Sequence, residues 1–397
     1  MKAGVSEVKM LFRPFGRTGE NVSILGFGCM RLPVKEGRHE DIDVPLATDM
    51  LHHAIDQGVN YIDTAFPYHS ATFGDKPGAS ESFVGQALAG DYRDRVLLAT
   101  KQPGWLVKSP KDMKEILAGQ LERLRSDRID CYLLHGVDGE EFERLSGLGA
   151  LEFLDQAKKD GKIRFAGFSF HDEGSAFAPI VDAYDWDFCQ IQYNYMDVDY
   201  QAGAAGLAYA ADRGLAVVVM EPLKGGRLTG PVPASVQALW DKAPVQRTPA
   251  AWALRFVWDD SRVNLLLSGM STMEQVAQNV EVASGGYPAS LSAAELTTIG
   301  QVQEAYRART VVDCTSCRYC MPCPEDIDIP MMFNMLNNAS LFDTLTEERR
   351  TYSIETEAGH TAPASACTEC GQCVEACPQQ LDVIREMASV AKTMEAK

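Results

Sequence analysis

The residues from 96 to 136 read VLLATKQPGWLVKSPKDMKEILAGQLERLRSDRIDCYLLHG. Both ends of this stretch are short apolar runs, VLLATK at 96–101 and CYLLHG at 131–136, and MKEILAGQLERLRSD at 113–127 reads as a helix. Runs that are continuously apolar, without alternation, are typical of strands buried on both faces of a parallel sheet. The stretch therefore predicts a strand, a helix and a second, parallel strand.

The same unit recurs on both sides of this stretch. Further strands, each followed by a helical pattern, are predicted at LGFGCM (25–30), YIDTA (61–65), FAGFSF (165–170), FCQIQYN (188–194), AVVVMEP (216–222) and NLLLSG (264–269). Eight such units in about 280 residues favour a closed (β/α)8 barrel, the TIM barrel of the α/β class. An open doubly wound sheet is the alternative, but no G-x-G-x-x-G follows the first strand.

The composition limits the partners and the compartment. The chain has 397 residues, 11 cysteines and a formal net charge of −18, which argues against a general affinity for nucleic acid or anionic lipid. No apolar run reaches the roughly 18–20 residues that span a bilayer, and the N-terminus lacks the apolar region of a signal peptide. We expect a cytoplasmic protein without membrane or nucleic-acid partners, in which clustered cysteines serve as metal ligands or redox groups.

Four ionisable residues stand at the ends of neighbouring predicted strands. Asp63 and Tyr68 follow one strand, Lys101 ends the next, and His135 ends the one after it. In TIM barrels the catalytic residues collect at the carboxyl ends of the strands. Each residue alone has a structural explanation, such as a loop cap for Asp63 or a core position for His135. Their joint placement at one rim predicts a catalytic site.

The segments IDTAFPY, LLATK and CYLLHG resemble the three signature segments of the aldo-keto reductase superfamily, and SESFVGQAL resembles the family's segment after the second strand. The resemblance covers roughly residues 10–285. It implies a small-molecule carbonyl or alcohol substrate, NADP or NAD as cofactor, and a catalytic tetrad of Asp63, Tyr68, Lys101 and His135.

The chemistry of carbonyl reduction explains these four residue types. The pKa of free tyrosine is about 10, and a nearby ammonium lowers it by stabilising the phenolate. Lys101 would supply that charge and Asp63 would pair with it. Tyr68 would be the general acid, or the base in the oxidation direction. His135 would orient the carbonyl and donate a hydrogen bond to the developing oxyanion.

The resemblance also implies a set of cofactor contacts. Ser169 and Gln190 would hold the carboxamide of nicotinamide, and Met220 stands where family members often stack an aromatic ring. EPLKGGRL (221–228) resembles the loop that covers the pyrophosphate, and SGMSTMEQVAQN (268–279) resembles the adenosine-phosphate site. The latter has no basic residue, so the choice between NADPH and NADH stays open. The implied contacts are Ser169, Gln190, Met220, Leu223, Gly225, Ser268, Gly269, Met270, Gln275, Gln278 and Asn279.

Two groups of four cysteines follow the predicted barrel. They are Cys314, Cys317, Cys320 and Cys323, then Cys367, Cys370, Cys373 and Cys377, and a proline follows each group. The second group fits C-x2-C-x2-C-x3-C-P, the bacterial ferredoxin pattern, and the first is one residue short before its fourth cysteine. Zinc is the alternative, but structural zinc usually takes two C-x2-C pairs separated by a longer loop. The pattern favours two 4Fe-4S clusters.

In such ferredoxins the fourth cysteine of each group binds the other cluster. We therefore expect one cluster on Cys314, Cys317, Cys320 and Cys377, and the other on Cys367, Cys370, Cys373 and Cys323. The segment between the groups reads as helical and resembles the alpha-helical ferredoxin type, whose clusters are often oxygen-sensitive, so we expect an anaerobic or low-oxygen host. The predicted domains are a barrel at 9–290, a connecting helix at 291–310 and a small, mainly helical iron–sulfur domain at 311–397.

Three functional hypotheses remain, because the predicted barrel moves hydrides, cubane clusters move single electrons, and no flavin motif is present. The clusters exchange electrons with a partner protein or the substrate. Alternatively they are structural or redox-sensing beside an ordinary reductase. As a third possibility, the barrel is a non-catalytic nicotinamide-binding module. The complete tetrad argues against the third hypothesis, and the presence of two clusters favours electron transfer.

Overall fold

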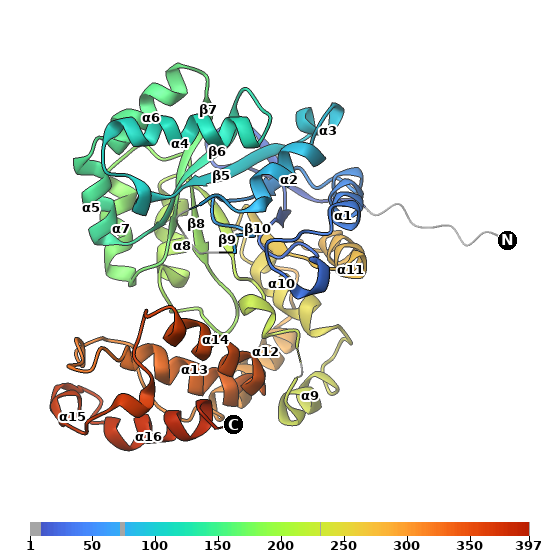
Figure 1. Ribbon diagram of the computed structural model, residues 1–397. Coiled ribbons are helices and arrows are strands. Elements are labelled where there is room, and N and C mark those ends of the chain that lie inside the picture. The colour runs from blue at the N-terminus through green and yellow to red at the C-terminus, as the bar shows by residue number, and fades with distance from the viewer. Residues whose placement is uncertain (1–8, 72–75, 231, 397) are drawn as a thin grey trace. The chain divides into compact units, whose positions relative to one another are not determined.

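The structure is a computed structural model that describes residues 9–71, 76–230 and 232–396. It divides into two compact units (Figure 1). The first, the barrel unit, runs to Gly225 and includes Ala250–Ser292. The second, the cysteine unit, comprises Gly226–Pro249 and the chain from Ala293 onward. The sequence-based domain boundaries stay a prediction, and the contacts group Gly226–Pro249 with the cysteine unit rather than with the barrel.

Eight parallel strands close into a barrel in the order β10-β3-β4-β5-β6-β7-β8-β9. The strands are β3 (Leu25–Gly28), β4 (Tyr61–Asp63), β5 (Leu97–Gln102), β6 (Ile129–Val137), β7 (Ile163–Phe170), β8 (Phe188–Gln192), β9 (Ala216–Met220) and β10 (Leu265–Gly269). A hairpin of β1 (Phe12–Pro14) and β2 (Asn21–Ser23) precedes them. The (β/α)8 prediction is confirmed, and the open doubly wound sheet is excluded.

Side chains fill the inside of the barrel. Phe15, which follows β1, is fully buried there and packs against the rings of Tyr61 and Phe188, with ring centroids 5.9 and 5.4 Å away. Leucine, valine and alanine side chains from β5, β6, β9 and β10 complete this inner cluster. Since the interior is packed, the carboxyl ends of the strands are the part of the barrel on which a site can be built.

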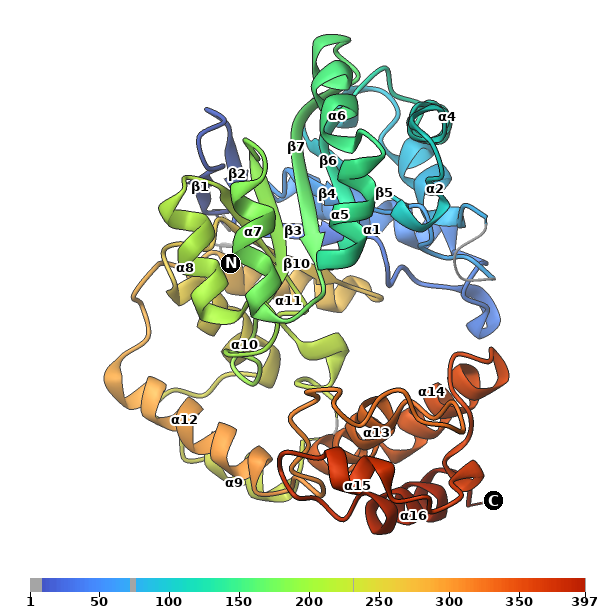
Figure 2. The ribbon, with the colours of Figure 1, turned by 90° about the vertical axis from the view of Figure 1, so that its left-hand side faces the viewer.

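Helices surround the strands, as α5, α7 and α8 do in Figure 2. They are α1 (Val44–Asp56), α2 (Ala79–Ala87), α3 (Asp91–Asp94), α4 (Pro110–Arg123), α5 (Gly139–Gly147), α6 (Ala150–Lys159), α7 (Gly174–Asp182), α8 (Gly203–Asp212), α10 (Pro249–Asp259) and α11 (Met273–Ala283). Asp43, Asp138 and Thr272 cap α1, α5 and α11 by accepting a backbone N–H of the first turn. Among the described residues, no helix has the length and apolar character required to cross a membrane.

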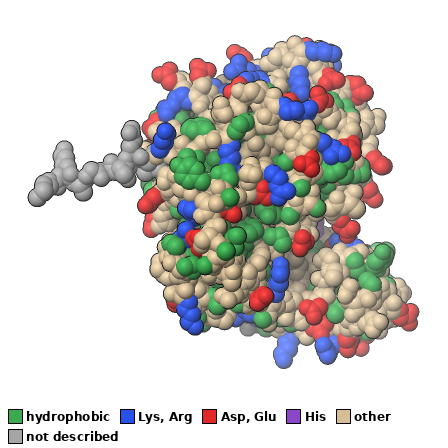
Figure 3. Space-filling view, turned by 180° about the vertical axis from the view of Figure 1, so that it is seen from behind, with side chains coloured by type: hydrophobic (Ala, Val, Ile, Leu, Met, Phe, Trp, Pro, Cys, Tyr) green, Lys and Arg blue, Asp and Glu red, His purple; other side chains and the backbone are tan. Residues whose placement is uncertain are grey.

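The regular elements described in the cysteine unit are helical, as predicted. They are α9 (Ala234–Trp240), α12 (Ala293–Arg307), α13 (Ile329–Phe342), α14 (Leu345–Glu357), α15 (Gln372–Ala376) and α16 (Val383–Met394). The apolar core lies between α13, α14 and α16, with Met332, Phe333, Met387 and Val390 at most 1% exposed. On the face shown in Figure 3, acidic and basic side chains are interspersed.

Candidate active site and cysteine cavities

The structure brings the four predicted catalytic residues together at the carboxyl ends of β4, β5 and β6. The Nζ atom of Lys101 donates to both carboxylate oxygens of Asp63 at 2.7 Å and to the carbonyl of Thr64 at 2.9 Å. It also lies 3.2 Å from the hydroxyl oxygen of Tyr68. The ring of His135 packs edge-on to the Tyr68 ring, with centroids 6.2 Å apart.

Burial and charge determine the protonation states of these groups. Burial by itself lowers the pKa of Lys101, but the attraction and hydrogen bonds to Asp63 and Tyr68 together outweigh it, so the pKa is raised and the ammonium form is kept. Burial raises the pKa of Tyr68 and exceeds the opposite effect of Lys101. The net direction is thus opposite to the one expected from Lys101 alone. It keeps the phenol protonated, which is the form that a general acid requires.

His135 stays neutral at the same site. Burial lowers the pKa of its imidazole, and the positive charge of Lys101 and the neighbouring His171 lower it further. Its Nδ1 atom is buried and has no hydrogen-bond partner among the residues that the structure describes. A buried polar atom without a partner is costly, so this ring is suited to bind a polar group of a ligand.

The residues predicted to hold nicotinamide lie on adjacent strands. Ser169 of β7 is paired with Gln190 of β8, and Met220 ends β9. The Ser169 Oγ atom accepts the N–H of Gly136 at 2.7 Å, and the Gln190 amide lies 3.5 Å from the sulfur of Met220. Gln190 is 2% exposed, and its Oε1 atom is unpartnered within the described chain. This free acceptor fits the N–H2 group of a carboxamide.

The residues predicted for the adenosine end lie around the start of α11. Ser268 and Asn279 are buried, and the Asn279 amide donates to the Ser268 hydroxyl at 2.9 Å, which fixes both side chains; their contact with the cofactor stays a prediction. The remaining predicted contacts differ in exposure. Gln275 accepts the N–H of Ser271, Gln278 donates to Glu274 on the exposed face, Met270 is buried, and Gly269 is exposed.

The predicted pyrophosphate loop follows β9. Leu223 packs on the barrel core, and Gly225 has a φ of +66°, which glycine adopts at little cost. Lys224 is held in an ion pair, because its Nζ atom lies 2.7 Å from each carboxylate oxygen of Asp197.

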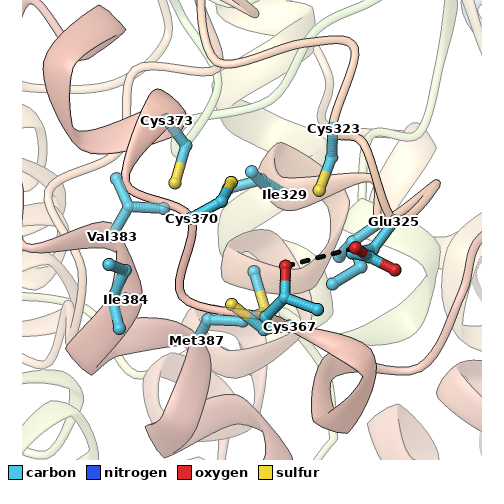
Figure 4. A pocket seen from close by; sticks show the side chains of 11 residues that line it. Cys323, Glu325, Ile329, Cys367, Cys370, Cys373, Val383, Ile384 and Met387 are labelled. Atoms are coloured by element: carbon cyan, nitrogen blue, oxygen red, sulfur yellow. Dashed lines mark hydrogen bonds between the residues drawn. The ribbon is translucent and has the colours of Figure 1, made fainter.

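The eight clustered cysteines border two separate cavities. Cys314, Cys317, Cys320 and Cys377 line one, and Cys323, Cys367, Cys370 and Cys373 line the other, which Figure 4 shows. These are the two sets that the crossed ferredoxin pattern groups together. Each cavity holds about 350 Å³ of empty space, part of it open to solvent. Within the described ranges, no group of three or more histidine, cysteine or acidic residues is arranged to hold a single metal ion.

The walls of both cavities are mostly apolar. Ile329 and Val383 line both of them, while Phe333 lines the first and Met387 the second. Thiolates that surround a cavity with apolar walls fit the ligand chemistry of an iron–sulfur cluster.

Comparison with known families agrees with this arrangement. Residues 24–304 match the model of the aldo/keto reductase family. The chain belongs to that family. Residues 313–381 of this aldo/keto reductase match a 4Fe-4S dicluster domain, so an iron–sulfur domain follows the barrel.

Several relatives of this aldo/keto reductase are enzymes. It is 28% identical over 334 residues to the NADH-specific methylglyoxal reductase of Escherichia coli, covering 74% of this chain and 98% of the relative. It is 30% identical over 263 residues to the 6-dehydroglucose reductase of Novosphingobium aromaticivorans, covering 61% of this chain and 81% of the relative. The solved structure of an aldo-keto reductase from Bacillus halodurans, in its holo form, aligns with a TM-score of 0.61 and 27% identity. The alignment covers 74% of this chain and 96% of that structure. The protein is therefore an oxidoreductase.

Sequence reasoning missed a buried polar network behind the tetrad of this aldo/keto reductase. Glu81 on α2 is fully buried and accepts hydrogen bonds from Thr100, Gln120 and Arg123 at 2.6–2.8 Å. Gln120 also donates to the carbonyl of Lys101 at 2.9 Å. The network thus fixes the end of β5. The sequence feature that could have indicated this network is the glutamate at position 81, on the buried face of helix α2.

Two further residues, Arg31 and His69, lie beside the predicted sites. His69 follows Tyr68 at a φ of +60°; its Nε2 atom accepts the N–H of Leu32, and its Nδ1 atom donates to the carbonyl of His39. Arg31 lies beside the predicted adenosine site, since a Cβ atom at Gly269 would stand 3.2–3.3 Å from its side chain. No local pattern marks either position, because both depend on how distant loops meet.

Proposed function

We propose that this protein interconverts a small-molecule carbonyl and its alcohol with NADPH or NADH, with Tyr68 as general acid or base. The observation that carries the proposal is the position of the Lys101 ammonium, held by Asp63 and 3.2 Å from the Tyr68 hydroxyl. A bound reduced nicotinamide supplies the hydride. The unpartnered Gln190 oxygen and the neighbouring Ser169 support binding of its carboxamide.

The chain's own residues then handle the proton and the developing charge. Tyr68 is protonated in the free protein and donates its proton to the carbonyl oxygen. The phenolate that remains is stabilised by the adjacent Lys101, which stays charged because Asp63 compensates it. The neutral ring of His135 donates a hydrogen bond to the same oxygen and orients the substrate.

The relatives suggest which carbonyl compounds to test first. Their names identify methylglyoxal and 6-dehydroglucose as substrates of those proteins. Both are oxygen-rich molecules, so small oxo-aldehydes and oxidised sugars are the first candidate substrates for this protein. The experiment is an anaerobic screen in which oxidation of NADPH and NADH is followed over a panel of such compounds.

Tyr68→Phe provides the test of the assigned role. The substitution removes one hydroxyl, and we expect kcat to fall by about 10²–10⁴-fold while cofactor affinity stays nearly constant. The matched control is Tyr200→Phe, because Tyr200 is 47% exposed. If Tyr68→Phe retained most of the wild-type kcat, the general-acid assignment would be wrong.

We further propose that the two cysteine cavities hold two 4Fe-4S clusters that transfer electrons. Two observations support this role over a purely structural one: Ile329 and Val383 line both cavities, so the two centres would be adjacent, and Cys370 is exposed. A one-electron reductant should reduce the clusters, and substrate with cofactor, or an electron-transfer partner, should reoxidise them. If the clusters could not be reduced reversibly, electron transfer would be ruled out and a structural or sensing role would remain.

A further inference from the structure

The segment Glu221–Leu228 has an unusual backbone. Glu221, Lys224, Gly225 and Gly226 have φ values of +55°, +48°, +66° and +96°. Residues other than glycine rarely adopt this conformation, so contacts with the rest of the protein have to hold the segment in shape. The boundary between the two units falls inside the segment, after Gly225.

The first end of this segment is held by the barrel unit. The Lys224 Nζ atom lies 2.7 Å from both carboxylate oxygens of Asp197. Asp197 also accepts hydrogen bonds from the amides of Gln192 and Asn194 at 2.9 and 3.0 Å. This anchor is therefore held by several polar contacts and belongs to the loop that follows β8.

The second end is held by the cysteine unit. The Nε and Nη2 atoms of Arg227 donate to one oxygen of Glu348 at 2.9 and 2.6 Å. The Glu348 side chain is 1% exposed and stands in the first turn of α14. Arg227 is its ion-pair partner within the described chain, so removing the arginine charge leaves the Glu348 carboxylate poorly compensated in a buried place, while Arg227 itself is 31% exposed.

The chain that continues from this segment also folds with the cysteine unit. Helix α9 packs against α12, and Arg247, near the end of Gly226–Pro249, forms an ion pair with the buried Glu295 of α12. Two arginine–glutamate pairs, Arg227–Glu348 and Arg247–Glu295, therefore clamp the two ends of this stretch.

We propose that Glu348 is a positioning residue for the dinucleotide: its ion pair with Arg227 fixes the second end of the segment that covers the cofactor phosphates. This inference rests on the proposed function. In TIM barrels, phosphate sites are frequently formed by the loops after the seventh and eighth strands. Glu221–Leu228 is such a loop, because it follows β9, the seventh barrel strand. A segment ordered beforehand costs less to bind than one that must be ordered by the ligand. Cofactor affinity is thereby linked, along the chain itself, to the integrity of the cysteine unit.

The first experiment uses Glu348→Gln in the full-length, anaerobically prepared protein. Iron content and circular dichroism establish that the variant is folded. We expect its Kd for NADPH or NADH, measured by the fluorescence of the bound cofactor, to rise about tenfold, mainly through faster release. The control is Glu347→Gln, since Glu347 is the exposed neighbour in the same helical turn, and its Kd should equal that of the wild type.

A double-mutant cycle tests whether the pair itself is responsible. Arg227→Gln should weaken binding as Glu348→Gln does, and the double variant should be no weaker than either single one. Arg227→Lys keeps the charge and should fall between the wild type and Arg227→Gln. Glu295→Gln loosens the other clamp and should leave cofactor release near the wild-type rate; an effect as large as that of Glu348→Gln would overturn the inference.

The remaining outcomes separate this inference from the proposed function. Wild-type protein that binds neither NADPH nor NADH would contradict the proposed function. Wild-type protein that binds cofactor, with a folded Glu348→Gln variant of equal or higher affinity, would contradict the role of Glu348 alone.

Discussion

In the barrel unit the charge of Lys101 is already compensated by Asp63, whereas in the cysteine unit four thiols border each cavity with mostly apolar side chains behind them. The tetrad is thus assembled by hydrogen bonds and ion pairs that the protein supplies. In the part of the cysteine unit that the structure describes, the Cys314 sulfur accepts the N–H of Ser316 at 3.4 Å, and we propose that the thiols gain their main partners from bound clusters. The difference is that the side chains of the barrel site hold one another in place, whereas we propose that the cysteine unit gains part of its folding free energy from bound clusters.

Cluster removal is expected to have the largest effect and addresses this comparison directly. Anaerobically produced protein should contain about eight iron and eight sulfide per chain. Chelation of the iron, or Cys373→Ser, should abolish cooperative unfolding of the cysteine unit, measured by circular dichroism and limited proteolysis, while the barrel transition persists. Cys189→Ala should leave the iron content unchanged, because Cys189 is buried in the barrel. Zinc instead of iron, or a cysteine unit that stays folded without iron, would break the comparison.

Glu81→Gln tests the barrel half of the comparison. The substitution removes a fully buried carboxylate that binds Thr100, Gln120 and Arg123. Loss of one partner of a buried pair should lower the free energy of unfolding by about 3 kcal/mol. Urea denaturation of the barrel measures this change, and the exposed Glu122→Gln is the control. An unchanged stability would show that the network does not hold the end of β5.

His69 makes the stability of the barrel depend on pH. Burial lowers its pKa from 6.5 to about 4, so between these values the unfolded chain binds the proton more readily than the folded one. The stabilisation is complete above pH 6.5 and is lost as the pH falls towards 4. His69→Asn, which tolerates the positive φ, should flatten this part of the stability profile relative to the wild type. An unchanged slope would contradict the assignment.

Arg31→Leu should have the smallest effect and sharpens the account of the cofactor site. Arg31 is the basic side chain beside Gly269, in a region whose own segment, 268–279, carries none. If it contacts the 2′-phosphate, the substitution should raise KM for NADPH by about fivefold and leave KM for NADH nearly unchanged. Arg38→Leu, at an exposed site, is the control. An equal rise for both cofactors would assign Arg31 to the pyrophosphate instead.

The sequence predicted the parts of the molecule that local patterns encode. Apolar runs and helical periodicity located the eight strands, and strand ends located Asp63, Lys101 and His135. Cysteine spacing grouped the thiols into the two sets that line the cavities. Contacts between distant segments carry no such signal: Glu348 lies 121 residues from Arg227, and Arg31 meets Gly269 only because β10 pairs with β3. For the same reason Gly226–Pro249, which reads as a barrel loop, is found with the cysteine unit.

Ile329 and Val383 each face both cysteine cavities. A change of side-chain size or polarity at either position therefore alters the surroundings of both centres at once. With a cluster in each cavity, as proposed, neither cluster can be retuned through this wall without an effect on the other. Substitutions at Ile329 or Val383 would therefore change the two reduction potentials together. Separate changes would require substitutions at residues that line one cavity alone, such as Phe333 for the first and Met387 for the second.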